Sequence, residues 1–285
     1  MELKEYTEKN RIAWNAVMPH HQKVKKAEWD KNFQEPGFII QEGVELEKLR
    51  DIGIAGKAII HLCCNNGREL LSLKNMDAGY CLGVDISDAA IKAARERAVA
   101  SGIDVEYLRS DVYDLGAEYA ERFDIVYITI GALVWLPDIN RFFNLVNRLL
   151  RKEGVVFIYD SHPFCHMLPW EGSADTKVEI LNPYFHREAW RWDDSMDYYG
   201  GAEYEAPEHY EFTYTLANIL MALIENGINI SFFGEYEKDI SCGMEWLEAR
   251  SMKLPLSYIL IGEKHKELTD EDKTNKSGRS EDCRF

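Results

Sequence analysis

HLCCNNGRE (61–69) closes one apolar run of the chain, and YCLGVDI (80–86) is the next such run. Segments in which apolar residues recur at helical spacing separate these runs. Short apolar runs of this kind suit strands that are covered on both faces, and the helices between them provide the cover. The alternation predicts an α/β fold with a doubly wound, mostly parallel sheet. The runs that extend the sheet are VEYLRS (105–110), FDIVYITIG (123–131) and VVFIYD (155–160).

The rest of the 285-residue chain is expected to flank this core. A helical pattern over 215–227 precedes two apolar runs that can pair as antiparallel neighbours in the same sheet. The predicted units are an N-terminal helical cover (1–56), the core (57–160), an aromatic, acidic insertion (161–212), a completing helix and two strands (213–265), and a disordered tail (266–285).

The amino-acid composition argues against several classes of partner and location. The formal net charge is −16 and the sequence pI about 5.0, which disfavours nucleic acid as a partner. No apolar stretch approaches the roughly 20 residues of a membrane span, and the charged N-terminus does not resemble a secretory signal. The six cysteines are sparse and form no metal-type pair. We therefore expect a cytoplasmic protein with reduced thiols, no metal and no membrane or nucleic-acid partner, as a monomer or homodimer.

A ligand site is predicted where the parallel strands end, because ligands of such sheets bind beyond the carboxyl ends of the strands. The turn after the first run contains Gly67, which tolerates positive φ, and Asn65 and Asn66, which tolerate it better than most residues. Backbone amides of a turn that leads into a helix can meet an anionic group. A ligand carboxylate could therefore lie against this turn.

Two aspartates follow the next two strands. Asp85 ends the second run, where a carboxylate can accept hydrogen bonds from two ribose hydroxyls. Asp111 follows the third run, where a carboxylate can receive an adenine amino group. The turn and the two acids together describe an adenosyl amino acid.

With these residues, the chain resembles the class I methyltransferases that use S-adenosylmethionine. The likeness covers roughly residues 57–160, and HLCCNNGRE is similar to the first motif of a bacterial small-molecule branch. The resemblance implies a Rossmann-like, seven-stranded sheet with an antiparallel last strand, and methyl transfer to a small-molecule acceptor. It also implies cofactor contacts from the strand ends and from an N-terminal helix that covers the methionine end of the cofactor. These contacts are Asp85, Ile86, Asp111, Val112, Thr129, Ile130 and Gly131 on the strand side, and Tyr6, Asn10 and Trp14 on the helix.

The first motif departs from the family pattern of acid-x-Gly-x-Gly-x-Gly. His61, Cys63 and Asn65 occupy the first three fixed positions, and only Gly67 matches. All four stay among the predicted cofactor-binding residues. His61 is also expected to be a hydrogen-bonded core histidine, and Cys63 to need a negative φ because it is bulkier than glycine.

The insertion has two compatible interpretations, a small β subdomain or dimer surface, and a lid that shapes the acceptor pocket. It contains eleven aromatic residues, and eleven acidic against three basic side chains. An acidic, aromatic pocket would suit an amine or another cationic acceptor. Trp190, Tyr199 and His166 are the predicted pocket residues. His162, directly after the fifth run, is the predicted base if the acceptor is a hydroxyl.

Two other functions remain open at this point. One is a protein that binds an adenosyl ligand without catalysis, consistent with the altered first motif. The other is a nicotinamide-dependent oxidoreductase, which also uses an acid after the second strand. That class expects G-x-G-x-x-G over the pyrophosphate, and CCNNGR (63–68) lacks it.

Overall fold

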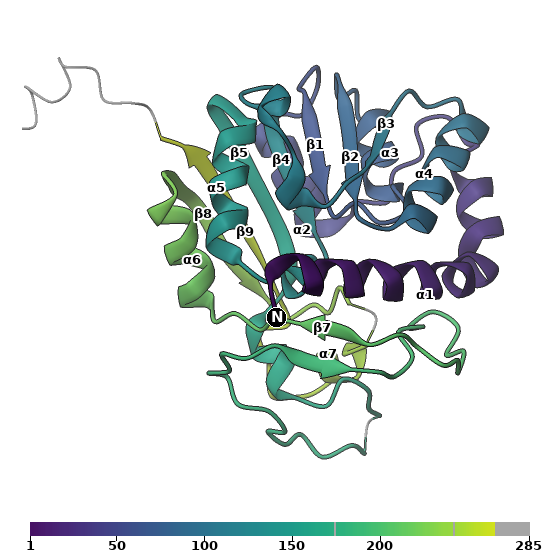
Figure 1. Ribbon diagram of the computed structural model, residues 1–285, viewed down its shortest axis with the longest axis vertical. Helices are drawn as coiled ribbons and strands as arrows, with labels where there is room; N and C mark the ends of the chain where they lie inside the picture. The colour runs from purple at the N-terminus through teal and green to yellow at the C-terminus, as the bar shows by residue number, and fades with distance from the viewer. Residues whose placement is uncertain (174, 242, 266–285) are drawn as a thin grey trace, which may run out of the picture.

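The computed structural model describes residues 1–173, 175–241 and 243–265. The tail predicted over 266–285 lies outside the described residues. The chain forms one large sheet with helices on both faces, a long N-terminal helix across the ends of the strands, and a smaller layer beyond that helix (Figure 1).

The large sheet has seven strands in the order β3-β2-β1-β4-β5-β9-β8. β1 to β5 pair in parallel, and β9 pairs antiparallel with both β5 and β8. The predicted fold class and the antiparallel pairing of the last two runs are thus confirmed. The strands are β1 (Ile59–Leu62), β2 (Cys81–Asp85), β3 (Glu106–Arg109), β4 (Phe123–Thr129), β5 (Leu150–Ser161), β8 (Ile228–Tyr236) and β9 (Ser257–Lys264).

Each face of the sheet buries its own apolar core. Ile60 and Leu62 of β1 pack with Phe142 of α5 and Leu223 of α6, whereas Ile59 on the other face packs with side chains of α2, α3 and α4. This alternation follows from the two-residue period of a strand and places apolar side chains on both faces of β1. The helices are α2 (Gly43–Ile52), α3 (Arg68–Asn75), α4 (Asp88–Ser101), α5 (Ile139–Leu149) and α6 (Leu216–Glu225).

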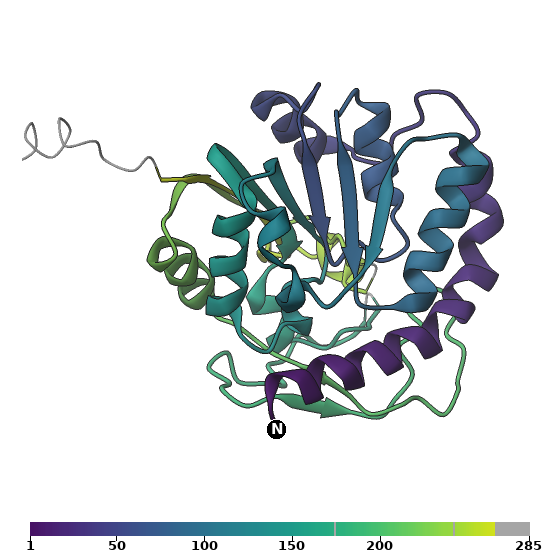
Figure 2. The ribbon, with the colours of Figure 1, turned by 45° about the horizontal axis from the view of Figure 1, so that its top comes forward.

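The N-terminal helix α1 (Leu3–Asn32) runs along the carboxyl ends of the strands and against α4 (Figure 2). It continues through Pro19, although proline removes one helical hydrogen bond. Asn15 fixes it to the start of α4, since its side-chain oxygen accepts hydrogen bonds from Ser87 Oγ at 2.8 Å and from the Ala89 amide at 3.1 Å. The helix therefore covers the carboxyl ends of the strands, where the ligand site is predicted.

The insertion contains little regular structure. Its two short strands, β6 (Trp190–Trp192) and β7 (His209–Glu211), form a separate antiparallel ribbon, and β7 contacts α1. Short helical turns follow β4 (η3, Leu133–Trp135) and β5 (η4, Pro163–Met167), and α7 (Glu245–Glu248) precedes β9.

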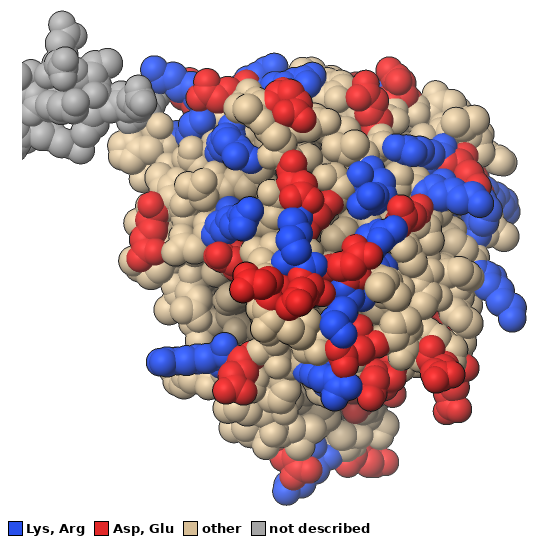
Figure 3. Space-filling model, in the orientation of Figure 1, with Lys and Arg blue, Asp and Glu red and all other residues tan. Residues whose placement is uncertain are grey.

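The side of the molecule that carries α1 shows acidic and basic side chains interleaved (Figure 3). Several of these charges pair with one another, as Arg11 does with Asp88 at 2.7 Å. Among the described residues, no helix combines the length and apolar character that crossing a membrane requires.

Candidate active site

The residues at the carboxyl ends of β1 to β5 form one surface, which we call the strand-end floor. It comprises residues 63–67, 85–86, 111–112, 129–131 and 160. Asp85 ends β2 and is 9% exposed. Its two carboxylate oxygens accept hydrogen bonds from the Asn65 and Ser87 amides, both at 2.8 Å. Burial raises the pKa of Asp85 to about 6 in spite of these bonds. Asp85 thus joins the first-motif turn to the end of β2.

The first-motif turn uses positive φ at three positions, Cys63 (56°), Asn65 (49°) and Gly67 (78°). Asn65 takes the left-handed conformation that its residue type tolerates, as predicted. The expected negative φ at Cys63 is wrong. The backbone requires a left-handed residue there, and a side chain in that conformation costs about 1–2 kcal/mol. The chain therefore keeps the backbone path of a glycine-rich turn while replacing two of its glycines.

Gly67 has a packing reason as well as a conformational one. A Cβ at this position would lie 2.4 Å from the hydroxyl oxygen of Tyr107, a residue of β3. The Tyr107 hydroxyl donates a hydrogen bond to the Gly67 carbonyl at 2.9 Å. Tyr107 thus supports the turn from below, and any larger residue at Gly67 would displace it.

Asp111 is covered by the first turns of α1. Thr7 Oγ1 and Lys4 Nζ both donate to Asp111 Oδ2 at 2.8 Å, and the Tyr113 amide donates to Oδ1 at 3.0 Å. The predicted adenine contact at Asp111 would therefore share the carboxylate with a lysine and a threonine. Of the neighbouring predicted contacts, Ile86 directly follows Asp85, and Val112 is buried in the core beside α5.

The turn after β4 is organised by Asp160, at the end of β5. Asp160 Oδ1 accepts hydrogen bonds from the Gly131 amide at 2.5 Å and from the Ser161 amide at 2.8 Å. Burial raises the pKa of Asp160 to about 6. Ile130 in the same turn is 42% exposed. Asp160 therefore fixes the predicted contacts at 129–131, a role that the sequence did not reveal.

His61 is the buried, hydrogen-bonded histidine that the sequence suggested. Its ring is 1% exposed, Nε2 lies 3.0 Å from Thr129 Oγ1, and burial lowers its pKa to about 4. The imidazole is therefore neutral near pH 7. Within the part of the chain that the structure describes, its Nδ1 has no hydrogen-bond partner.

Above the floor lies a second layer, which we call the cover: α1 together with residues 186–212. Asn10 joins its two parts, because its side chain donates to the Tyr210 carbonyl at 2.8 Å and accepts from the Tyr210 amide at 2.7 Å. Tyr6 packs edge-on against Tyr210, at 5.0 Å between ring centroids. Trp14 packs edge-on against Trp135 of η3 at 5.2 Å. These three predicted residues share the inner face of α1. The side chain of Asn10 is hydrogen-bonded to the backbone of β7.

The predicted base, His162, has both ring nitrogens engaged. Nδ1 accepts a hydrogen bond from the Phe164 amide at 3.0 Å, and Nε2 lies 2.9 Å from Glu235 Oε1 of β8. The ring is buried at 5% exposure and caps η4. A proton acceptor role at His162 would require one of these two contacts to break.

The three predicted pocket residues have different surroundings. His166 lies in η4, and burial lowers its pKa to about 4. Trp190 in β6 stacks on His186 at 3.9 Å between centroids. Tyr199 lies beside the first-motif turn, where its hydroxyl is 3.4 Å from an Arg68 nitrogen. The three residues thus contact different parts of the fold, and His166 lies outside the cover.

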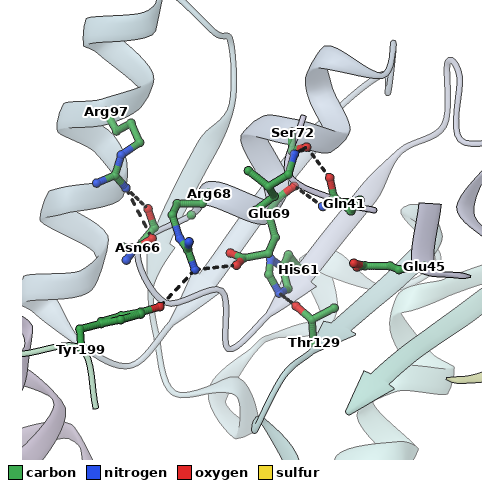
Figure 4. A network of polar contacts seen from close by, with 12 residues as sticks. Gln41, Glu45, His61, Asn66, Arg68, Glu69, Ser72, Arg97, Thr129 and Tyr199 are labelled. Atoms are coloured by element: carbon green, nitrogen blue, oxygen red, sulfur yellow. Dashed lines mark hydrogen bonds and ion pairs between the residues drawn. The ribbon is translucent and has the colours of Figure 1, made fainter. Parts of the chain in front are cut away.

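Figure 4 shows a polar network around the first-motif turn that the sequence did not predict. Arg68 and Glu69, the first residues of α3, form an ion pair at 3.1 Å. Arg97 of α4 donates to the Asn66 carbonyl at 2.8 Å. Among the described residues, buried polar atoms without a partner include His21 Nδ1, Gln22 Nε2 and Asn65 Oδ1. Unpaired buried polar atoms beside the turn fit a polar ligand, because such atoms are otherwise costly.

Comparison with known proteins agrees with this geometry. Residues 59–154 match a protein family described as "Methyltransferase domain". A relative, the ubiquinone biosynthesis O-methyltransferase of Salmonella paratyphi A, is 28% identical over 108 residues, which are 38% of this chain and 44% of that protein. The chain thus matches less than half the length of this relative.

Solved structures share the fold of this chain over a longer span than the family match. An S-adenosylmethionine-dependent methyltransferase from Mesorhizobium loti has a TM-score of 0.58 at 23% identity, and covers 78% of this chain and 98% of its own. A second, from Listeria monocytogenes, has a TM-score of 0.58 at 16% identity and covers 77% and 97%. At these identities the two likenesses show a shared fold.

Proposed function

We propose that this chain transfers the methyl group of S-adenosylmethionine to a small-molecule acceptor. The observation that carries the proposal is the joining of Asp85 to the Asn65 amide at 2.8 Å, which places a carboxylate and the first-motif turn side by side. The relative from Salmonella is named as an O-methyltransferase of ubiquinone biosynthesis, which supports a small molecule rather than a macromolecule as the acceptor.

The cofactor supplies a methyl group on a positively charged sulfur, and the protein's part is alignment and exclusion of water. Asp85 would accept the ribose hydroxyls, and the turn at 63–67 would hold the amino-acid end. The turn at 129–131, fixed by Asp160, and the α1 residues Tyr6 and Trp14 would close around the reacting centre. Asp111 would contact the adenine with Lys4 and Thr7 as neighbours.

We place the acceptor beneath the β6–β7 ribbon. His209 is 3% exposed and lies 6.0 Å from Trp135 between ring centroids, so this face of the ribbon is turned toward η3. Glu211 shares the face, by the two-residue period of a strand, and burial raises its pKa to about 7. Trp190 lies directly opposite Glu211 in the ribbon. A partly buried carboxyl among aromatic rings favours an amine or another cation as the acceptor.

An amine acceptor attacks through its lone pair, so a bound ammonium group must first release its proton, and Glu211, with a pKa raised to about 7, is the group beside it that could accept that proton. The neutral amine then needs no base during the transfer. A hydroxyl acceptor does need one, and His162 remains the sequence-based prediction for that role. The contacts of His162 with Phe164 and Glu235 favour the amine.

The test is calorimetry with S-adenosylmethionine, S-adenosylhomocysteine and NADH, followed by turnover assays. We expect binding of both adenosyl ligands, no binding of NADH, and acceptor-dependent formation of S-adenosylhomocysteine with a panel of amines and phenols. Replacing Glu211 by Gln should raise KM for an amine and leave cofactor affinity unchanged. Binding without turnover across the panel would favour a non-catalytic adenosyl-ligand protein. Absence of binding would refute the proposed function.

A further inference from the structure

A pocket of about 520 Å³ lies at the opposite edge of the large sheet from the strand-end floor. Its lining begins where three parallel strands begin, because Tyr80 directly precedes β2, Val105 precedes β3 and Arg122 precedes β4. Parallel strands start at one edge of a sheet and end at the other, and the predicted cofactor site lies where they end. We call this second place the edge pocket. The side chains that determine its chemistry are Tyr80, Leu82, Arg95, Glu106, Tyr119 and Arg122.

The walls of the edge pocket are largely apolar and aromatic. Leu82 of β2 belongs to the core on one face of the sheet, and Leu108 of β3 packs against the same core. The rings of Tyr80 and Tyr119 pack there as well, and Tyr119 ends a short helical turn, η2 (Ala117–Tyr119). Pockets for small molecules typically have volumes of roughly 300–1,000 Å³, with apolar and aromatic walls and a few polar groups. The edge pocket has this size and this kind of wall.

Arg122 provides a cation over the two aromatic rings. Its guanidinium lies 5.6 Å from the ring centroid of Tyr80 and 6.0 Å from that of Tyr119. Arg122 is exposed, and its side chain forms no hydrogen bond or ion pair with the part of the chain that the structure describes. The N–H donors at the edge of a guanidinium match the two oxygens of a carboxylate. Arg122 therefore presents an unused carboxylate-binding group beside an aromatic wall.

A second guanidinium makes the edge pocket positively charged. Arg95 is fixed to β3, because its Nε and Nη2 donate to the Tyr107 carbonyl at 3.2 and 2.6 Å. Glu106 is the acidic side chain among the described lining residues, and it accepts a hydrogen bond from the Tyr80 hydroxyl at 2.8 Å. Two guanidinium groups against one carboxylate leave a net positive charge, in a chain whose formal net charge is −16. Such a pocket favours an anion.

We propose that the edge pocket is a second ligand site, which binds a flat organic anion of the aromatic carboxylate class. The anionic group binds to Arg122, with Arg95 as the second cation, and the aromatic body lies against Leu82. The edge pocket shares no residue with the strand-end floor or the cover. The inference therefore does not rest on the proposed function, and it stands even if no adenosyl ligand binds.

The experiment is equilibrium dialysis of the full-length protein with naphthoate as the probe and naphthamide as its uncharged analogue. We expect saturable binding of naphthoate with a Kd below about 1 mM, and naphthamide should bind at least about tenfold more weakly. Arg122→Gln should weaken naphthoate about tenfold, because the charge-assisted hydrogen bonds are lost. Arg122→Lys keeps the charge without the planar donors and should have an intermediate affinity. Glu106→Gln keeps an acceptor for the Tyr80 hydroxyl, removes a negative charge, and should tighten naphthoate.

The matched control is Arg141→Gln. Arg141 is also an exposed arginine over a tyrosine ring, 5.5 Å from the ring centroid of Tyr113, and it lies outside the edge pocket. This variant should bind naphthoate as the wild type does, and circular dichroism checks that each variant is folded. The site is overturned if the wild type shows no saturable binding of naphthoate, or binds naphthamide equally well. It is also overturned if Arg122→Gln and Arg141→Gln have the same affinity, or if Glu106→Gln binds naphthoate more weakly than the wild type.

Discussion

The strand-end floor and the cover are built from different kinds of contact. In the floor, the strands position the side chains. Asp85 and Asp160 each accept a hydrogen bond from a backbone amide in the turn that follows a neighbouring strand, and this bond fixes the turn. In the cover, a helix and an irregular segment are joined through single side chains, as Asn10 joins Tyr210. From this difference we expect the floor to be the pre-formed part of the site and the cover to be the part that opens to admit ligands.

The largest expected effect is in the floor. Asp85→Asn should lower the affinity for S-adenosylhomocysteine about 100-fold, because an amide has one acceptor oxygen where the carboxylate has two. The remaining oxygen cannot hold both the Asn65 amide and the ribose hydroxyls. Calorimetry measures the effect, with Asp104→Asn, an exposed residue before β3, as the control. An affinity within threefold of the wild type would contradict the role of Asp85.

The cover should be sensitive to Asn10. Asn10→Ala leaves the amide and carbonyl of the buried residue Tyr210 without their side-chain partner, and we expect the free energy of unfolding to fall by about 2 kcal/mol. Hydrogen exchange should quicken in α1 and β7 while β1 and β2 stay protected. Glu8→Ala on the exposed side of the same helix serves as control. Uniform loss of protection over the whole chain would show that floor and cover are not separable.

The affinity for S-adenosylhomocysteine should depend on pH through the aspartates of the floor. Asp85, with a pKa of about 6, accepts hydroxyl hydrogen bonds best when ionised, so affinity for S-adenosylhomocysteine should rise about tenfold between pH 5 and 7.5. The sign follows because the ligand favours the deprotonated carboxylate. Asp85→Asn should reduce the pH dependence to the part that Asp160, also with a pKa of about 6, contributes. A wild-type affinity that falls over this range would contradict the assignment.

The smallest effect is expected at Cys63, and its neighbour Cys64 provides the comparison. Cys63→Gly should change stability by less than about 1 kcal/mol, since relief of the left-handed backbone offsets the lost side-chain packing. Cys64 is fully buried and is not among the positive-φ residues, so Cys64→Gly should destabilise by about 2 kcal/mol. Urea denaturation of both variants gives the comparison. Equal losses would show that the backbone conformation at Cys63 carries no strain.

The floor could be predicted from the sequence because strands leave a periodic pattern and their ends follow from it. Asp85 and the turn at 63–67 were located in this way, and the turn does adopt the backbone of a glycine-rich loop. The conformation of Cys63 was not predicted, because a residue type indicates only which backbone conformation it prefers. The path of the chain between β1 and α3 determines which conformation the position requires.

The cover could not be predicted in the same way. Its contacts, Lys4 and Thr7 with Asp111 and Asn10 with Tyr210, join single residues far apart in the chain and leave no periodic trace. The sequence of the first motif contains Arg68 and Glu69, but it does not show that the two side chains form an ion pair. Its burial beside Tyr199 depends on how the cover packs, which the sequence pattern did not report.

The bond between Asn10 and Tyr210 joins residues separated by 200 positions. A ribosome adds about 5–20 residues per second, so α1 is synthesised roughly 10–40 seconds before its partner strand. During that interval Tyr6, on the inner face of α1, has no ribbon to pack against. Nascent chains shorter than about 210 residues should therefore be substrates for chaperones, and the site should become able to close only when most of the protein has been translated.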